Sequence, residues 1–334
     1  MSLYDAIGVG SQGRLGIVGF SQENFAPPGR KGAVVSIKTG LSEVVNEPHD
    51  SLAGTIDRIY GFNNRNELMG NREGCHTESG GTCTKELYQY GISPEPRYIS
   101  VTSTTDATCI SWISVTQIGD MPPTAWTGDI GWYCGQKWYN SLNHAGRLLD
   151  SHLYYFPKCT WVDADNTNYI TAGALKFDTK AYGEDSIDTF RGNVCKPTIF
   201  AQANEPIGPR PQSAHPQSVF PQPAHPHAAQ PDKRGTEDRP LWMTERLIMS
   251  NFTSHPAEEL CSSATSWGPD FIGSDGKFCD MGSKTLIPLC SSKDIDGCIE
   301  VDEDNGTLVK RMSVARRSAN IVHKNYRSIS KWEE

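Results

Sequence analysis

Hydrophobic and polar residues alternate over several short stretches of the chain, as half-buried β-strands require. Residues 97–103 (RYISVTS) and 108–116 (TCISWISVT) are rich in β-branched and aromatic side chains, and residues 104–107 between them suit a turn. These segments predict two strands joined as a hairpin. Residues 174–179 (ALKFDT) alternate in the same way and predict a further strand.

The C-terminal part shows the same pattern. Residues 277–281 and 284–290 flank Gly282-Ser283 and predict one hairpin. Residues 298–302 and 307–312 predict a second hairpin, in which Asn305-Gly306 suits a primed turn.

Helical spacing of apolar residues is rare in this chain. Residues 133–142 carry partial helical spacing and predict one short helix, and residues 52–60 predict another. Only 37% of the residues are hydrophobic, whereas glycine (31) and proline (21) are abundant, which favours turns and short strands. We therefore expect a mainly β fold.

Residues 201–240 interrupt the alternation. This stretch holds nine prolines and almost no large apolar side chains, so it is predicted to be an exposed linker. The linker defines three parts: a β-sandwich-like domain with few short helices over 1–200, the Pro/His-rich linker over 201–240, and a small β-hairpin module with a basic tail over 241–334.

Ten cysteines are the strongest compositional signal. No two stand closer than eight positions apart and no C-x-x-C occurs, which argues against zinc and thioredoxin-like sites and favours disulfides. Six precede the linker and four follow it, so each part can close its own bridges, although the sequence leaves the pairing open. The predicted disulfide cysteines are Cys75, Cys83, Cys109, Cys134, Cys159, Cys195, Cys261, Cys279, Cys290 and Cys298.

A disulfide-rich chain is typical of the extracellular space. The sequence opens MSLYDAIGVG, which is not a signal peptide, so either the protein is cytosolic or such a peptide has been removed, and we expect the second. Two N-glycosylation sequons, at Asn251 and Asn305, agree with secretion, and Lys233-Arg234 is a candidate processing site. The net charge of −8 gives no reason to expect nucleic-acid binding, and no apolar run is long enough for a membrane span.

Aromatic residues are concentrated in the segment 126–140 (WTGDIGWYCGQKWYN). Exposed rings can stack on sugar faces while polar neighbours bind the hydroxyl groups. The alternative is that the rings pack a small core around Cys134. The candidate ligand-binding residues are Trp126, Asp129, Trp132, Tyr133, Trp138 and Tyr139.

The segment 163–168 (DADNTN) places Asp163, Asp165 and Asn168 on one tight loop. Clustered oxygen atoms are the ligands that calcium prefers, so calcium is the candidate metal and no other cofactor is expected. Asn168 stands where an EF-hand loop has its glycine, and hydrogen-bonded Asx turns are the alternative interpretation.

Motifs for catalysis are weak or missing. Residues 8–13 match G-x-G-x-x-G, but only seven residues precede them and no carboxylate follows at positions 30–36, so dinucleotide binding is not expected. The sequence contains neither G-x-S-x-G nor H-E-x-x-H. An enzymatic activity is therefore not predicted, although a hydrolase with an unrecognised site stays open.

Three segments carry a resemblance to known proteins: 109–116 (CISWISVT), 127–139 (TGDIGWYCGQKWY) and 159–168 (CTWVDADNTN). With the tail from Gly276 to Asp302, they resemble uncharacterised secreted proteins of filamentous fungi. The resemblance implies secretion and a fungal source, and it carries no catalytic residues.

These observations together predict an extracellular binding protein. Its expected partner is a glycan, or another component of a cell wall or host surface. A secreted hydrolase, and a precursor cut at Lys233-Arg234, are the alternatives.

Overall fold

The computed structural model describes residues 20–42, 51–88, 95–118, 123–147, 153–182, 194–208, 239–311 and 321–333. The chain divides into two compact units. The first comprises residues 1–41 and 45–224, and the second comprises residues 42–44 and 225–334. Residues 209–238, and with them most of the predicted linker and Lys233-Arg234, lie outside the described residues.

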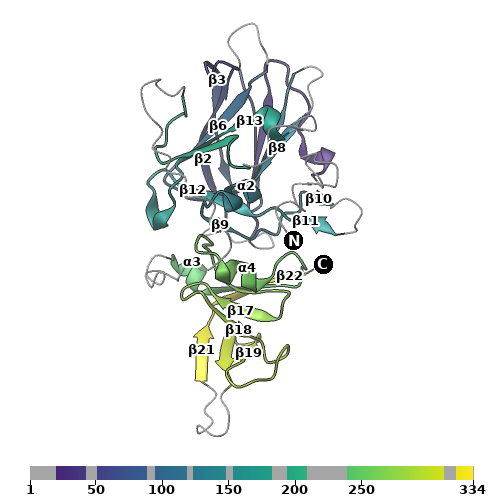
Figure 1. Cartoon of the computed structure of the whole chain (residues 1–334), viewed down its shortest axis with the longest axis vertical. Helices are drawn as coiled ribbons and strands as arrows, with labels where there is room; N and C mark the ends of the chain where they lie inside the picture. The colour runs from purple at the N-terminus through teal and green to yellow at the C-terminus, as the bar shows by residue number, and fades with distance from the viewer. Residues whose placement is uncertain are drawn as a thin grey trace. The chain divides into compact units, whose positions relative to one another are not determined.

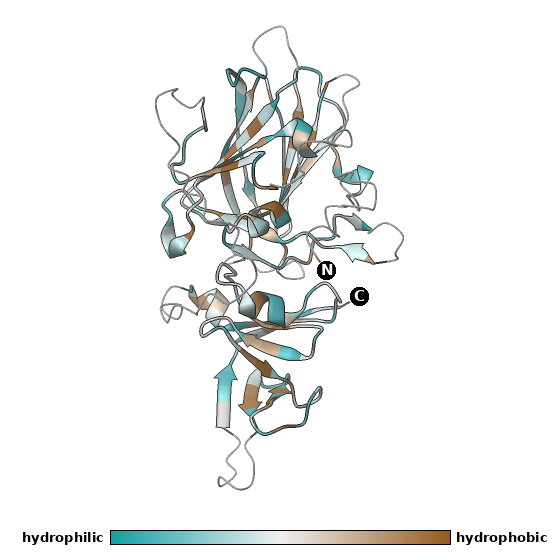
Figure 2. Ribbon diagram, viewed as in Figure 1, coloured by the Kyte–Doolittle hydropathy of each residue, from teal (hydrophilic) through white to brown (hydrophobic). Residues whose placement is uncertain are grey.

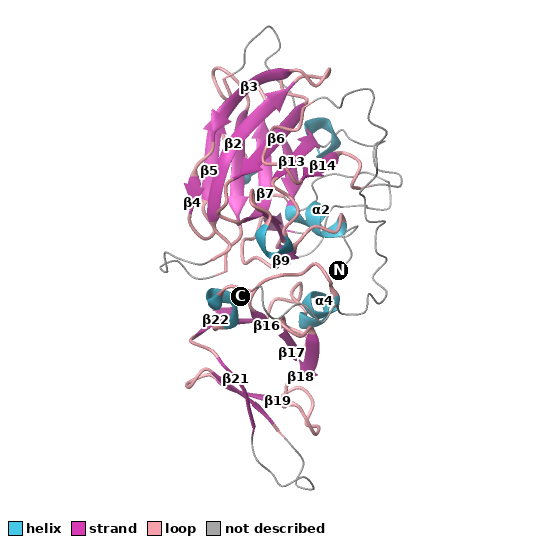
Figure 3. Ribbon diagram, turned by 90° about the vertical axis from the view of Figure 1, so that its left-hand side faces the viewer, coloured by secondary structure: helices cyan, strands magenta, loops and turns pink. Residues whose placement is uncertain are grey.

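The first unit contains two antiparallel sheets (Figures 1 and 3). In one sheet the strand order is β5-β1-β7-β12-β9, and β8 lies beside β12 on the same edge of β7. Its strands are β1 (Val34–Thr39), β5 (Thr82–Glu86), β7 (Thr108–Thr116), β8 (Thr124–Thr127), β9 (Trp138–Tyr139) and β12 (Cys159–Val162).

The other sheet of this unit has the order β14-β13-β6-β2-β3, with β4 paired to β2. Its strands are β2 (Gly54–Phe62), β3 (Leu68–Glu73), β4 (His76–Thr77), β6 (Tyr98–Ser103), β13 (Ala174–Asp178) and β14 (Thr198–Ala201). A separate ribbon joins β10 (Gly146–Arg147) to β11 (Tyr154–Tyr155). Short helical turns are η1 (Gln22–Asn24), α2 (Gly128–Tyr133), η2 (Thr167–Tyr169) and η3 (Thr179–Tyr182).

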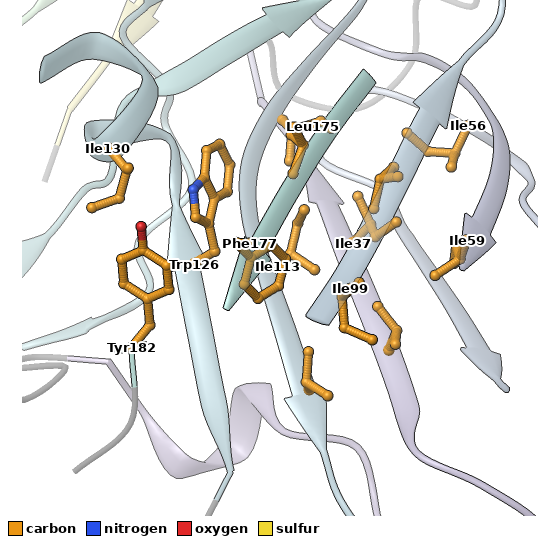
Figure 4. Packing of buried hydrophobic residues seen from close by; sticks show 14 of the residues in the cluster. Ile37, Ile56, Ile59, Ile99, Ile113, Trp126, Ile130, Leu175, Phe177 and Tyr182 are labelled. Carbon is orange, nitrogen blue, oxygen red and sulfur yellow. The ribbon is translucent and has the colours of Figure 1, made fainter. Parts of the chain in front are cut away.

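The inner faces of the two sheets share one hydrophobic core. Ile37 and Ile113 come from the first sheet and Ile99 and Leu175 from the second, and all four are fully buried (Figure 4). Brown and teal segments follow one another along these strands in Figure 2, as expected when successive side chains point to opposite faces. This arrangement confirms the predicted mainly β, sandwich-like fold.

The predicted hairpin between residues 97–103 and 108–116 is wrong in its pairing. Both segments are strands, but β6 pairs with β2 and β13, whereas β7 pairs with β1, β8 and β12 in the opposite sheet. Both strands are buried over almost their whole length, which is typical of central strands. The turn between them therefore crosses from one layer to the other.

The predicted helix over 52–60 is also wrong, because this segment forms β2. A register shift between Ile56 and Arg58 inserts a β-bulge. The bulge turns both Ile56 and Ile59 inward, and they are 1% and 0% exposed. Two inward residues three positions apart imitate helical spacing, which explains the wrong assignment.

The helix predicted over 133–142 is wrong, because the helix of this region is α2, which ends at Tyr133. It ends at a Schellman motif, in which Gln136 N donates to Gly131 O (2.9 Å) and Gly135 N to Trp132 O (3.1 Å). Gly135 has φ +77°, the left-handed conformation that this motif requires. The chain then continues into β9.

The second unit also has two sheets. The larger has the order β18-β17-β16-β15-β22, and β15 runs parallel to both of its neighbours. Its strands are β15 (Arg246–Ser250), β16 (Asp270–Ile272), β17 (Lys277–Asp280), β18 (Thr285–Pro288) and β22 (Ser328–Trp332), and the smaller sheet has β19 (Ile299–Asp302), β20 (Thr307–Lys310) and β21 (Ile321–Asn325). The helices are α3 (Leu241–Thr244) and α4 (Ala257–Ser262). In the described part of the chain no helix has the length and apolar character needed to cross a membrane.

Both hairpins predicted in this unit are present, as β17–β18 and β19–β20. The turn of β19–β20 differs from the primed turn that was expected. Four residues connect Asp302 to Thr307, and of them only Gly306 has positive φ (+64°). The Asp302 carboxylate accepts hydrogen bonds from the backbone N–H (3.2 Å) and the side-chain amide (2.8 Å) of Asn305, which fixes this longer turn.

All ten cysteines are described and form five disulfides, as predicted. Three bridges lie in the first unit and two in the second, so none joins the two parts. The pairs are Cys75–Cys83, Cys109–Cys159, Cys134–Cys195, Cys261–Cys279 and Cys290–Cys298. Five disulfides are compatible with an extracellular protein.

Candidate functional site

Three of the predicted ligand-binding rings lie in the interior. Trp126, Trp138 and Tyr139 are each 0% exposed. Trp126 lies within the core near Phe177, with ring centroids 6.5 Å apart, and its indole N–H donates to Thr198 Oγ1 (3.2 Å) (Figure 4). Because these rings present no face to solvent, they cannot form the sugar-stacking platform expected from the sequence. The alternative interpretation, that the rings pack a core, therefore holds for Trp126, Trp138 and Tyr139.

Asp129 is buried as well, with 3% of its surface exposed. Its carboxylate accepts hydrogen bonds from Tyr155 Oη (2.5 Å) and from the backbone N–H of Lys158 (3.3 Å). Burial raises the pKa of Tyr155 well above its ordinary value, and the adjacent Asp129 carboxylate raises it further. Asp129 therefore positions the segment that contains Tyr155 and Lys158, and it is not open to a ligand.

Trp132 and Tyr133, on α2, are the predicted rings that remain partly exposed. The Lys158 ammonium lies 4.5 Å from the centre of the Trp132 ring, and Trp132 packs edge-on against Trp138 (5.9 Å between centroids). Trp132 is therefore held on its inner side and open on another.

The segment around β11 supplies further exposed side chains. Burial alternates strictly from 154 to 159: Tyr154, Phe156 and Lys158 are partly exposed, whereas Tyr155, Pro157 and Cys159 are buried. Alternate residues of an extended chain point to the same side. Tyr154, Phe156 and Lys158 therefore share one outward face.

Two more residues extend this face. The rings of His144 and Tyr154 have centroids 5.0 Å apart, and Phe156 lies 6.3 Å from Tyr154 and 6.4 Å from His144. The Arg147 guanidinium lies 5.0 Å from the centre of the Tyr154 ring and donates to Tyr154 Oη (3.2 Å). We call this surface the aromatic strip, defined as Trp132, His144, Arg147, Tyr154, Phe156 and Lys158.

Sequence reasoning found only Trp132 of this strip. The signal for the others is the pattern LYYFPKC over residues 153–159, in which rings alternate between outward and buried positions. The sequence alone does not show which of the two sets points outward.

The predicted metal residues lie together in the loop after β12. Asp163 is fully buried, and its Oδ2 accepts hydrogen bonds from Thr167 N (3.0 Å) and Thr167 Oγ1 (2.7 Å). Asp165 Oδ1 accepts from the same Thr167 N (3.2 Å), and Asn168 Nδ2 donates to Thr167 Oγ1 (3.2 Å). These bonds are the Asx-type turn that was weighed as the alternative to a metal site.

Two oxygen atoms of this loop have no hydrogen-bond partner among the described residues: Oδ1 of Asp163 and Oδ1 of Asn166. Desolvation raises the pKa of Asp163, and the neighbouring Asp165 carboxyl raises it further. Desolvation acts upward on Asp165 too, but hydrogen bonds from Asp163 and Thr167 leave the pKa of Asp165 below its ordinary value. Of the two carboxyls, Asp163 is therefore the one whose charged form the loop disfavours.

The backbone of the loop is left-handed at Asn166 (φ +56°) and Asn168 (φ +54°). Asn168 therefore adopts the positive φ that glycine normally supplies at the sixth position of an EF-hand loop. The described residues contain no group of three or more His, Cys, Asp or Glu side chains arranged to hold a metal ion. Any site here would depend on amide, hydroxyl and carbonyl oxygens beside the two carboxyls.

A buried ionic network in the second unit was not anticipated from the sequence. Asp270 is fully buried and accepts hydrogen bonds from Arg239 (2.8 Å), Lys324 (2.7 Å) and Tyr326 Oη (2.7 Å). Lys324 also pairs with Asp280 (2.8 Å). Because Lys324 lies on β21 and Asp270 on β16, the network joins the two sheets of this unit.

The two sequon asparagines, Asn251 and Asn305, are both exposed. Comparisons with protein-family models, with curated proteins and with solved structures gave no match to the chain. Function must therefore be argued from the residues themselves.

Proposed function

We propose that this protein is an extracellular carbohydrate-binding protein of a cell wall or host surface, and that the aromatic strip is its binding site. The observation that supports the proposal is a set of partly exposed rings: Tyr154 and Phe156 lie 6.3 Å apart, and Trp132 lies beside Lys158. Sugar rings present apolar C–H faces, which stack on aromatic side chains, and hydroxyl groups, which bond to polar neighbours. Five disulfides agree with an extracellular location.

The scaffold favours binding over catalysis at this place. Tyr155 and Cys159 anchor the segment through the bond to Asp129 and the disulfide to Cys109. Rigid rings bind with little loss of conformational entropy. A secreted hydrolase, and a precursor cut at Lys233-Arg234, remain alternatives that no described residue favours.

The test is binding of the intact, oxidised protein to a panel of polysaccharides, by pull-down and calorimetry. Tyr154→Ala and Trp132→Ala should each weaken binding at least about tenfold, which corresponds to about 1.4 kcal/mol. Tyr88→Ala is the matched control, since Tyr88 is an exposed ring (38%) that also contacts a cation, Arg72, at 3.9 Å. Equal losses in all three variants, or no binding by the wild type, would remove the proposal.

We further propose that the loop 163–168 binds calcium. The supporting observation is the buried, unpartnered Oδ1 of Asp163, whose carboxyl is directed into the loop by its bonds to Thr167. Asp163, Asp165 and Thr167 occupy the first, third and fifth positions of a calcium loop, and Asn168 has the required positive φ.

Calorimetric titration with CaCl₂ tests this site. Binding should weaken as the pH falls, because both carboxyls must be ionised to bind calcium. Asp163→Asn should abolish the heat of binding, whereas Asp302→Asn, in another acidic turn, should preserve it. Heats that are unchanged in Asp163→Asn, or absent in the wild type, would count decisively against calcium.

A further inference from the structure

A buried lysine in the first unit lies against the side-chain amide of an asparagine. Lys176 is on β13, and its neighbours Leu175 and Phe177 face the core, so its side chain points to the opposite face of the sheet. Lys176 is nevertheless only 3% exposed. Its ammonium donates hydrogen bonds to Asn66 Oδ1 and to the carbonyl oxygen of Ile207. An amine and an amide carbonyl are thus held in direct contact.

The turn between β2 and β3 holds Asn66 in position. The backbone N–H of Asn66 donates to Asn63 O (2.9 Å), and the side-chain oxygen of Asn63 accepts from the backbone N–H groups of Arg65 and Glu67 (both 2.9 Å). Asn66 has φ +66°, a left-handed conformation in which asparagine is enriched. The contact therefore joins two ordered positions of one sheet that are 110 residues apart in the sequence.

The surroundings of the Lys176 amine are apolar or neutral. The centre of the Phe62 ring lies 3.5 Å from its nitrogen and that of the Tyr98 ring 5.4 Å, and Tyr98 is the titratable group that faces it. In the part of the chain that the structure describes, no carboxylate pairs with Lys176. Desolvation lowers the pKa of Lys176 to about 8. Half of the amine is therefore neutral near pH 8, and a neutral amine is a nucleophile.

The side chain of Asn66 is placed as the electrophile. Lys176 binds its Oδ1, and the carbonyl carbon Cγ is one bond away from that oxygen. Asn66 Nδ2 has no hydrogen bond to any described residue, and Asn66 is partly exposed, so ammonia released from it can reach solvent. Well-oriented intramolecular reactions reach effective molarities of about 10⁵–10⁸ M, which brings the otherwise very slow attack of an amine on an amide into a measurable range.

We propose that Lys176 and Asn66 join in an intramolecular isopeptide bond. The Lys176 nitrogen attacks Asn66 Cγ, the Nζ–Cγ bond forms, and the Cγ–Nδ2 bond breaks. A proton of the amine passes to Nδ2, which leaves as ammonia, so the step needs no oxidant and no other reactant. Because no described carboxyl group pairs with Lys176 to assist the proton transfer, the bond forms slowly. Freshly folded protein therefore has the free amine and aged protein the cross-link.

The experiment follows the intact, oxidised protein by mass spectrometry during incubation over several weeks. The wild type should become lighter by one molecule of ammonia, and its digest should contain a peptide in which Lys176 is joined to Asn66. Asn305-Gly306 can also lose ammonia by forming a succinimide, so the joined peptide is the decisive signal. It should form about tenfold faster at pH 9 than at pH 7, because the neutral fraction of an amine with a pKa of about 8 rises by that factor.

Variants assign the bond to this pair. Lys176→Met and Asn66→Ala should each abolish the joined peptide, whereas Lys180→Met and Asn64→Ala, at exposed neighbouring positions, should retain it. Aged wild-type protein without the joined peptide overturns the proposal, and so does hydrolysis of Asn66 to aspartate as the only change at this residue. The wild-type digest decides between these outcomes even where a variant fails to fold.

Discussion

Lys176 gives the stability of the first unit a specific dependence on pH. It lies on β13, is only 3% exposed, and its ammonium is 3.5 Å from the centre of the Phe62 ring and 5.4 Å from that of Tyr98. Its hydrogen-bond acceptors are two neutral oxygens, Asn66 Oδ1 and the carbonyl of Ile207. Desolvation lowers the pKa of Lys176 from 10.5 to about 8.

The sign follows from which state binds more protons. Between pH 8 and 10.5 the unfolded chain keeps the Lys176 proton while the folded unit loses it, so stability rises with pH. The full effect is about 3.4 kcal/mol, at 1.36 kcal/mol per pKa unit. Because tyrosines titrate near pH 10, the measurement is restricted to pH values up to about 9.5. Between pH 8 and 9.5 the free energy of unfolding should increase by about 1.6 kcal/mol.

The assay is urea unfolding of the oxidised protein at several pH values across this window, followed by tryptophan fluorescence, which reports on both units. Lys176→Met should remove the rise in stability, whereas Lys180→Met, an exposed lysine just beyond β13, should keep it. Lys38 also has a lowered pKa, caused by burial, and contributes in the same direction, so the difference between variant and wild type is the decisive quantity. A wild type that loses stability from pH 8 to 9.5, or a rise that persists in Lys176→Met, would refute the reasoning.

Three further predictions concern the scaffold. Replacing Cys134 and Cys195 together by alanine removes a disulfide between residues 61 positions apart. Loop entropy predicts that the free energy of unfolding, measured by chemical denaturation, falls by about 4 kcal/mol. A decrease below about 1 kcal/mol would contradict that account. Asp270→Ala leaves the buried Arg239 guanidinium without its carboxylate and the partly exposed Lys324 with Asp280 alone, and it should cost the second unit about 3–5 kcal/mol of unfolding free energy. An unchanged midpoint would show that the network is dispensable. Asn251 and Asn305 should both carry glycans in protein secreted by a eukaryotic host. Enzymatic deglycosylation should then lower the intact mass by the mass of two glycans. If replacement of either asparagine by Gln leaves this decrease unchanged, that position is not glycosylated.

Local patterns in the sequence predicted the β-rich fold, the two C-terminal hairpins and the oxidised cysteines. Each of these three predictions uses only residues close together in the sequence, or the amino-acid composition. The strand over 174–179 was found because alternation is strict there, and Leu175 and Phe177 do face the core. The pairing of strands was less accessible: β6 and β7 are adjacent in sequence, but each has partners in a different sheet, which is a non-local property.

The errors have identifiable physical causes. A bulge near Ile56 breaks the period of two and imitates a helix, since both Ile56 and Ile59 face inward. The aromatic segment misled for another reason. A high local content of aromatic residues does not indicate that their rings are exposed. Trp126 can be buried in the core because its indole N–H donates a hydrogen bond to Thr198 of the other sheet.

The aromatic strip shows why the same residue types differ in burial between two segments. Along residues 154–159 two of the three buried side chains are anchored: Tyr155 by Asp129, and Cys159 by the disulfide to Cys109. The intervening side chains are thereby held outward on a backbone that cannot rotate to bury them. An exposed ring costs little when its backbone is already fixed, and binding then orders few additional groups. The buried aromatics and the disulfide thus support the exposed rings, as the proposed binding surface requires.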